Sequence, residues 1–322
     1  MNLRPALGQL KTVLYRKPKD ELRRLRRWGP HAYLRLGAWQ ARMEAAAHQL
    51  PPVVATDLGA PPLEVWYLTG ARFWYQTAFC AWTLARWSGR RLVLNLTDDG
   101  SLSAAQEQAL RRLFPQGTTR WRSACWEQFQ QLLPEPQYPT LHARWHDYIN
   151  LHKLTAIHLG SRGPKLVLDS DMLFFARPEA LLGWWDRDLA ADASGELVQP
   201  CLMVDCEEAY GYSPELMREL VGVPIPPLLN VGVCGLSSEA LDWAELEHWC
   251  RTLLEREGTN YYLEQALVAM LAARHSPTVL HRDSYITFPS RAQTLARQGV
   301  LQHYVADSKP WYFREAWGLA CQ

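Results

Sequence analysis

Two aspartates follow a short apolar segment near the middle of the chain. Residues 165–168 have the composition of a buried parallel strand, and Asp169-Ser170-Asp171 comes directly after them. If the extended geometry continues, alternation places Asp169 and Asp171 on one side and Ser170 on the other. Two carboxylates on one side are hard oxygen ligands that suit Mg²⁺ or Mn²⁺. The alternative is an Asx turn, or a cap for the helix that begins near Pro178.

A histidine and a lysine near the C-terminus could complete such a site. Residues 300–305 have the pattern of a strand that contains His303, and Lys309 follows six positions later. A neutral imidazole is a good third ligand for Mn²⁺, and a lysine can contact a phosphate as a point charge. Taken alone, each residue also fits an ordinary role, as a half-buried histidine and a surface lysine. One loop could thus hold a metal and a diphosphate together.

The spacing His303-x5-Lys309-Pro-Trp resembles the C-terminal signature of glycosyltransferase family 8 and its GT-A-fold relatives. That family usually has Gly where this chain has Ala306. Further segments follow in the family's order, namely Tyr67-Leu-Thr-Gly70, Lys153, Asn230-Val-Gly-Val233 and Tyr262-Leu-Glu-Gln265. The resemblance spans residues 63–313, but residues 186–227 and the segment before Pro51 have no counterpart in it.

The resemblance implies a site for a UDP-sugar and a divalent cation, Mn²⁺ or Mg²⁺. It assigns the metal to Asp169, Asp171 and His303. The donor would contact Tyr67, Thr69 and Gly70 at the uracil and ribose, Lys153, Asn230 and Gly232 near the sugar, Lys309 at the diphosphate, and also Ser170 and Trp311. Glu264 and Gln265 would face the reacting carbon.

The resemblance also implies retention of configuration at the anomeric carbon. Retaining glycosidases use two carboxyl groups, whereas here Glu264 is the only acid placed near the sugar, and Gln265 would be a poor nucleophile. We therefore predict same-face substitution, in which the departing diphosphate helps to take the proton of the acceptor hydroxyl. Gln265 would support positive charge through its carbonyl oxygen, and Glu264 would orient the sugar or the acceptor. The acceptor itself, a carbohydrate, lipid or protein, leaves no signature.

The elements that must position these residues alternate between strand and helix patterns. They run in the order strand 63–70, helix 76–87, strand 91–96, helices 103–114 and 141–158. This order predicts an α/β fold with a mostly parallel sheet flanked by helices, as in the GT-A fold. In such sheets ligands bind beyond the carboxyl ends of the strands. Proline pairs after residue 50 divide the chain into a basic helical extension, residues 1–55, and a catalytic domain, residues 56–322.

Charge is unevenly distributed along the 322 residues. The first 50 residues carry eleven Lys or Arg against three acids, although the net charge of the whole chain is only +1. Residues 11–28 could therefore lie on an anionic membrane surface, with a solvated basic helix packed on the main domain as the alternative. The seven cysteines form no C-x-x-C pair, and no signal peptide or membrane span is recognisable. We expect a cytoplasmic protein, at most peripheral on the inner face of a membrane.

Three other classes of function compete with this interpretation. A sugar-phosphate nucleotidyltransferase would show a Gly-rich phosphate loop, whereas residues 67–75 hold one Gly and Arg72. A zinc site could use four histidines that lie in one segment, His142, His146, His152 and His158. However, this segment contains no H-E-x-x-H motif. A non-enzymatic membrane- or nucleic-acid-binding protein is the third class. We expect no nucleic acid, because no basic patch interleaved with aromatics follows the leader.

Overall fold

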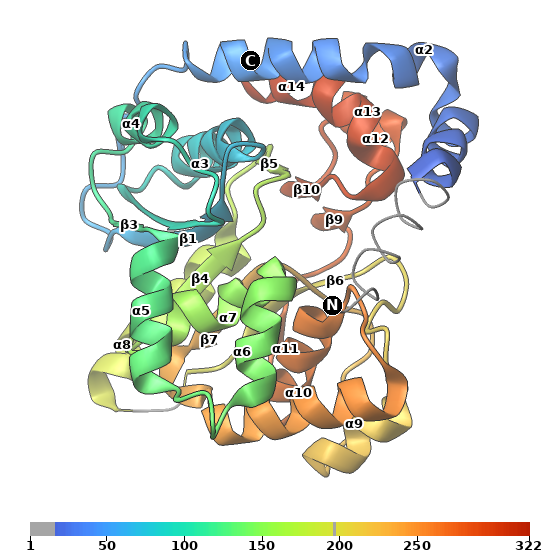
Figure 1. Cartoon of the computed structure of the whole chain (residues 1–322). Helices are drawn as coiled ribbons and strands as arrows, with labels where there is room; N and C mark the ends of the chain where they lie inside the picture. Colours follow the sequence, from blue (N-terminus) through green and yellow to red (C-terminus); the bar gives the residue numbers. More distant parts are fainter. Residues whose placement is uncertain (1–16, 196–197) are drawn as a thin grey trace.

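The computed structural model describes residues 17–195 and 198–322, with side chains from residue 25 onward. The chain forms an α/β fold around a seven-stranded sheet (Figure 1). In spatial order its strands are β3 (Thr119–Arg120), β2 (Leu92–Asp98), β1 (Leu63–Thr69), β4 (Pro164–Leu168), β7 (Leu229–Ser237), β6 (Cys201–Val204) and β8 (Thr278–Val279). All neighbours pair in parallel except β7, which is antiparallel to both β4 and β6. The predicted mostly parallel sheet is therefore confirmed.

Alternation along the strands explains why both faces of this sheet are covered. Val65 and Tyr67 of β1 belong to one hydrophobic core, whereas Trp66 belongs to the other. In the same way, Leu166 and Leu168 face the first core, and Val167 faces the second. Side chains of period two on a strand that is buried on both faces give a nearly continuous apolar sequence, as predicted for β4.

A second sheet of three strands lies beside the first. It contains β5 (Met172–Phe174), β10 (Leu301–His303) and β9 (Tyr285–Thr287), with β10 in the centre, antiparallel to β5 and parallel to β9. The chain passes from β4 in the large sheet to β5 in the small sheet through Asp169-Ser170-Asp171 alone. The two aspartates therefore lie where the chain changes from one sheet to the other.

Helices flank the large sheet on both faces (Figure 1). The face with Val65 and Tyr67 packs against α3 (Trp74–Ser88), α4 (Ala104–Leu113) and α8 (Glu179–Ser194). The opposite face packs against α5 (Arg122–Leu132), α6 (Pro139–Asp147), α7 (His152–His158), α9 (Pro214–Val221), α10 (Trp243–Glu257) and α11 (Leu263–Ala273). The C-terminal region adds α12 (Arg291–Leu295), α13 (Lys309–Trp311) and α14 (Trp317–Ala320). Short helical turns are η2 (Ile149–Leu151), η3 (Ser238–Ala240), η4 (Ala306–Ser308) and η5 (Tyr312–Ala316).

One predicted helix is interrupted. Residues 141–158 form α6 and α7 with the turn η2 between them, because Tyr148 leaves the helical region at φ −140° and ψ 90°. The Tyr148 hydroxyl donates to the carbonyl oxygen of Tyr261 at 2.5 Å and accepts from the backbone N–H of Glu264 at 3.2 Å. The break thus turns an aromatic side chain toward the start of α11, which helical periodicity did not predict.

The N-terminal helix α2 (Lys17–Ala47) crosses the C-terminal helices and bends at one end (Figure 1). The bend lies at Gly29, with φ 78° and ψ 159°, directly before Pro30, which cannot continue a regular helix. Met43, Ala47 and Leu50 are buried in the core that includes Val65 of the sheet. The predicted membrane contact through residues 11–28 lies mostly outside the part of the chain whose side chains are described. None of the described helices is long and apolar enough to cross a membrane.

Candidate functional site

A cleft of about 710 Å³ opens beyond the carboxyl end of β4. Eight of the predicted site residues line it, namely Lys153, Asp169, Asp171, Asn230, Glu264, Gln265, His303 and Lys309. They come from α7, the β4–β5 connection, β7, α11, β10 and the segment after β10. The topology thus brings together residues that lie as far as 156 positions apart in the sequence, from Lys153 to Lys309.

Asp169, Asp171 and His303 converge on one point in this cleft. One ligand atom from each residue lies within 4.8 Å of the other two, and no other such group occurs among the described residues. The Nε2 atom of His303 lies 3.2 Å from Asp171 Oδ1 and 3.5 Å from Asp169 Oδ2. The predicted metal ligands are therefore close enough to share one ion.

The surroundings of His303 fit a metal ligand. Its ring is almost fully buried, and within the described structure Nε2 has no hydrogen-bond partner of good geometry. Nδ1 lies 3.2 Å from Asn230 Oδ1, which can only accept, so we assign the proton to Nδ1. That tautomer directs the lone pair of Nε2 toward two carboxylates. A cation between them would satisfy all three groups at once, as in other sites where a second residue orients a ligating histidine.

Asn230 is held in this orientation by its own neighbours. Its side-chain oxygen also accepts from the backbone N–H of Gly232 at 2.9 Å, and its Nδ2 donates to Asp205 Oδ2 at 2.8 Å. A Cβ atom at Gly232 would lie 2.5 Å from Nδ1 of His303, so this position has room only for glycine. Gly232 therefore lets the ring approach β7, and it lies behind the cleft wall.

Asp205 is a site residue that sequence reasoning missed. It is buried at the end of β6, lines the cleft, and accepts from Asn230 and from Nε2 of Gln265, the latter at 3.3 Å. The signal was present, because an acid directly follows the apolar strand Cys201–Val204, as Asp169 follows β4. Asp205 thus joins one predicted sugar-binding residue to one predicted catalytic residue.

Two lysines flank the acidic pair. Lys309 Nζ hydrogen-bonds Asp171 Oδ2, and Lys153 Nζ lies 2.6 Å from Asp169 Oδ1 and 3.5 Å from Glu264 Oε2. Burial alone would raise the pKa of Asp171, but the charge of Lys309 and the close contact with His303 lower it well below its usual range. Burial likewise opposes protonation of Lys153, yet Asp169 and Glu264 raise its pKa. Both lysines are therefore cations that contact the predicted metal ligands.

Glu264 differs from the other acids of the cleft. Its carboxyl group is buried, and this burial raises its pKa to about 7, with Lys153 opposing the rise and Asp169 adding to it. Next to it, Gln265 donates through Nε2 to Asp205 and to the carbonyl oxygen of Ala209 at 3.0 Å. Because both contacts use the amide nitrogen, the carbonyl oxygen of Gln265 is left for a ligand.

The remaining predicted residues lie behind or beside the cleft. Tyr67 is fully buried and donates to Cys80 Sγ at 3.2 Å, and Thr69 exchanges a hydrogen bond with Thr77, which is bonded in turn to Ser170. These side chains position strand ends and do not line the cleft. Gly70 and Trp311 do not line it either. The Trp311 ring nitrogen donates to the carbonyl oxygen of Pro289 at 2.9 Å, and a Cβ at Gly70 would collide with Asp99.

The four clustered histidines have structural surroundings. His142 and His152 each place a ring nitrogen at hydrogen-bond distance from a backbone carbonyl, 2.6 Å from Leu133 and 3.0 Å from Trp145. Burial lowers the pKa of His152 to about 4 and that of His158 to about 3. Among the described residues these histidines form no group that could hold a metal ion. The zinc alternative therefore has no support from the structure.

The fold, but not the sequence, matches known proteins. No family model matches the chain, and no curated protein matches it in sequence. Mouse xyloside xylosyltransferase 1 matches it in structure with a TM-score of 0.50 and 13% identity, over 77% of this chain and 99% of that one. The galactosyltransferase LgtC matches with a TM-score of 0.50 and 14% identity, over 80% and 95%.

A third solved structure gives the same result. The bifunctional glycosyltransferase WbbM matches with a TM-score of 0.50 and 13% identity, over 83% of this chain and half of its own length. All three similar structures are those of glycosyltransferases. The predicted GT-A fold is thereby confirmed, whereas the roles of individual residues rest on the geometry of the cleft.

Proposed function

We propose that this protein transfers a sugar from a nucleotide diphosphate donor, a UDP-sugar, to an acceptor hydroxyl with the help of a divalent metal ion. The observation that carries this proposal is the convergence of Asp169, Asp171 and His303 in a cleft of a glycosyltransferase fold. Three hard or borderline ligands beside two lysines suit a metal-bound diphosphate better than a purely structural ion. The proposed cation is Mn²⁺ or Mg²⁺.

The proposed cation would supply Lewis-acid stabilisation for the diphosphate leaving group. Asp169, Asp171 and His303 would hold it, and Asn230 would keep the His303 ring in the required tautomer. Lys309 would move from Asp171 to a phosphate oxygen, because a cation at Asp171 removes the negative charge that holds the lysine. Lys153 would stay beside Asp169 and Glu264, under the sugar.

We propose that transfer proceeds with retention, by same-face substitution. The carbonyl oxygen of Gln265, left unused by the contacts to Asp205 and Ala209, would support positive charge at the anomeric carbon. Glu264 would orient the sugar or the acceptor hydroxyl. The hydroxyl proton would pass to the departing diphosphate, so no carboxylate has to act as a nucleophile.

For the acceptor we propose a carbohydrate. Four aromatic side chains with exposed rings line the cleft, and flat amphipathic faces of this kind suit sugar rings. They are Phe73, Tyr261, Tyr262 and Phe288. A second cavity of about 310 Å³ adjoins the cleft and shares Asp205, Cys206 and Phe288 with it, which gives an extended acceptor additional room.

The decisive test is UDP release from a panel of UDP-sugars with Mn²⁺. We expect release that EDTA abolishes and that Asp171→Ala lowers by at least about a hundredfold, because one oxygen ligand and the orientation of Lys309 are lost together. Glu219→Ala, which removes an exposed carboxylate on α9, should leave the rate unchanged. Turnover by Asp171→Ala at the wild-type rate would contradict the metal assignment. Pyrophosphate release from a nucleoside triphosphate and a sugar phosphate would instead indicate a nucleotidyltransferase.

A further inference from the structure

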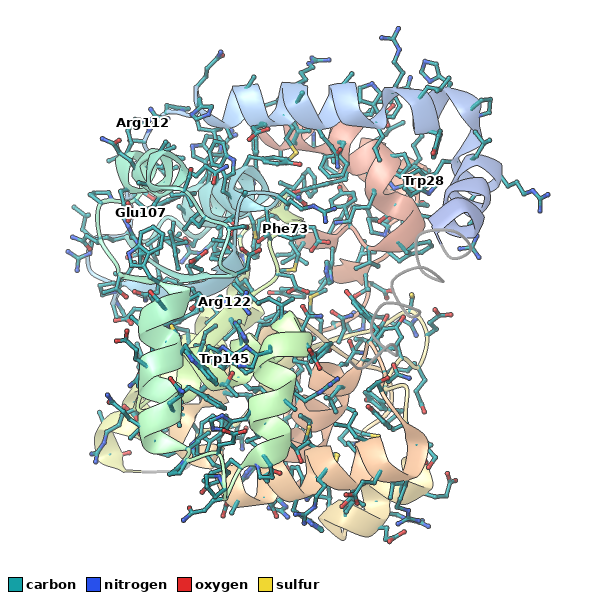
Figure 2. The ribbon with its side chains drawn as sticks, viewed as in Figure 1. Trp28, Phe73, Glu107, Arg112, Arg122 and Trp145 are labelled. Atoms are coloured by element: carbon teal, nitrogen blue, oxygen red, sulfur yellow. The ribbon has the colours of Figure 1, made fainter. Side chains whose placement is uncertain are left out.

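The bent end of α2 reaches the cleft. Arg27, two residues before the bend at Gly29, lines the cleft together with Asp307 and Lys309. Its Nη1 atom lies 2.7 Å from Asp307 Oδ2, and Nε1 of Trp28 donates to Asp307 Oδ1 at 3.0 Å. Figure 2 shows Trp28 on this part of α2, facing the C-terminal helices. Two adjacent residues of the N-terminal helix thus hold the loop that joins His303 to Lys309.

Charges in the cleft make Arg27 important for an anionic ligand. Among the residues that the structure describes, the cleft is lined by six acids and by three residues with fixed positive charge, Arg27, Lys153 and Lys309. The acids are Asp169, Asp171, Asp205, Glu207, Glu264 and Asp307. Such an acidic surface repels a nucleotide diphosphate, so each cation that can reach the diphosphate contributes to its binding. Arg27 is one of the three cations that the described part of the chain places in the cleft.

Of these three cations, Arg27 can most easily exchange its ion pair for a contact with a bound ligand. Lys309 and Lys153 are paired with Asp171 and Asp169, the proposed metal ligands, whereas Arg27 is paired with an acid outside that set. Half of its side chain is exposed, so exchanging Asp307 for another anion requires little rearrangement. A guanidinium group can donate two parallel hydrogen bonds to phosphate oxygens, which a lysine cannot do.

We infer that Arg27 binds the diphosphate of the nucleotide donor, so that α2 forms part of the donor site. This inference rests on the proposed function. In the free protein Asp307 holds the guanidinium group close to the position that it would take in the complex with the donor. When the donor binds, Arg27 leaves Asp307 Oδ2 for a phosphate oxygen, while the Trp28 bond to Oδ1 keeps the helix on the loop. Gly29, which has left-handed φ, lets residues before it adjust without moving residues 30–47.

The test measures UDP affinity by calorimetry in the presence of Mn²⁺, with the full-length protein. Arg27→Ala should weaken UDP binding about tenfold, because a charge-assisted bidentate contact is lost. Arg26→Ala removes an exposed arginine that does not line the cleft and should leave the affinity unchanged. Arg27→Lys should give an intermediate loss, since a point charge replaces the planar fork.

Asp307→Asn separates ligand binding from a merely structural role. Both Arg27→Ala and Asp307→Asn break the same ion pair, and the amide oxygen of the new side chain can still accept from Trp28, so both should lower the melting temperature by similar small amounts. If Arg27 is a ligand, Asp307→Asn frees it and UDP binds as tightly as to wild type or more tightly. Equal losses of UDP affinity in both variants would show that Arg27 only fastens the helix, and would overturn the inference.

The outcomes also distinguish this inference from the proposed function. Wild-type UDP affinity in Arg27→Ala overturns the role of Arg27 and leaves the proposed function standing. A wild-type protein that binds neither UDP nor another nucleoside diphosphate with Mn²⁺ overturns both.

Discussion

The fold keeps the Glu264 carboxyl group protonated at pH values at which an exposed glutamate is already ionised. Its carboxyl group is buried beside Lys153 and Asp169, and its pKa rises to about 7 from 4.5. Asp169 takes the shorter contact with Lys153, at 2.6 Å against 3.5 Å. Lys153 and Asp169 thus form the ion pair, and Glu264 is a third group that can be neutral near pH 7. A neutral carboxyl group can donate a hydrogen bond to a sugar oxygen, which a carboxylate cannot.

This pKa predicts how stability changes with pH. Between pH 4.5 and 7 the folded protein binds a proton at Glu264 that the unfolded chain releases, so this residue makes stability fall as the pH rises. Glu264→Gln has no such titration. Measured by urea unfolding in EDTA, the variant should match wild type near pH 4 and exceed it by up to about 3 kcal/mol at pH 8. A variant less stable than wild type at pH 8 would show that the ionised Glu264 stabilises the fold, and would contradict the raised pKa.

Some site residues could be predicted from the sequence and others could not. Asp169 and Asp171 directly follow a predicted strand, where α/β sheets gather ligand-binding residues, and the family resemblance added His303. The structure brings all three together. Arg27 carried no such signal, because its place depends on how α2 bends and packs over the finished fold. Tyr67 was misleading, because it lies on the predicted strand but its side chain faces the core.

At the scale of elements, the segment between His303 and Lys309 depends on an unusual backbone conformation. Ala306 has φ 44°, in the left-handed region that glycine adopts most readily. This is the position at which glycosyltransferase family 8 usually has Gly. The turn that places Lys309 against Asp171 is therefore kept in spite of the Cβ atom, which costs about 1–2 kcal/mol.

Ala306→Gly should relieve this strain. We expect a gain in stability of up to about 1 kcal/mol, since the relief exceeds the added flexibility of the unfolded chain. Ala296, at the end of α12 with φ −78°, is the matched control, and Ala296→Gly should lower stability. Thermal unfolding of both variants shows whether each substitution raises or lowers the stability. A loss in Ala306→Gly as large as that in Ala296→Gly would show that Ala306 carries no strain.

Sequence patterns identify the elements that depend on local composition, and miss those that depend on contacts between distant residues. The strand at Leu63–Thr69 and the helix at Trp74–Ser88 could be predicted locally, because each is a mostly apolar run of suitable length that is followed by Gly. The interruption at Tyr148 does not, since its cause is a contact with Tyr261, 113 positions away. Likewise, β5 is only three residues long and exists because β10 pairs with it. Long-range pairing leaves no periodic trace.

At the scale of the whole molecule, the N-terminal helix belongs to the core. Met43 is fully buried in the hydrophobic cluster that includes the sheet, and Glu44 accepts from Nε1 of Trp74 at 2.9 Å. Arg112 of α4 donates to the backbone carbonyls of His48 and Leu50. The segment predicted as a basic extension therefore has an inner part, near residues 43–50, that packs into the core of the α/β fold.

Met43→Ala tests this dependence. Removing a fully buried side chain should lower the free energy of unfolding by about 2–4 kcal/mol, with one cooperative transition. Leu34→Ala, on the same helix with 78% of its surface exposed, should change it by less than about 0.5 kcal/mol. Chemical denaturation followed by tryptophan fluorescence measures both. An unfolding curve for Met43→Ala that matches wild type would mean that α2 is an independent appendage.

The passage of the chain from one sheet to the other at Asp169 and Asp171 has a mechanical consequence. The two aspartates join β4 to β5, and His303 comes from the far end of the sequence, on β10. An ion bound by all three residues would cross-link the two sheets and close a loop of more than 130 residues. Binding of Mn²⁺ would then stabilise the whole fold, and the melting temperature would rise with the concentration of the ion in the absence of any sugar donor.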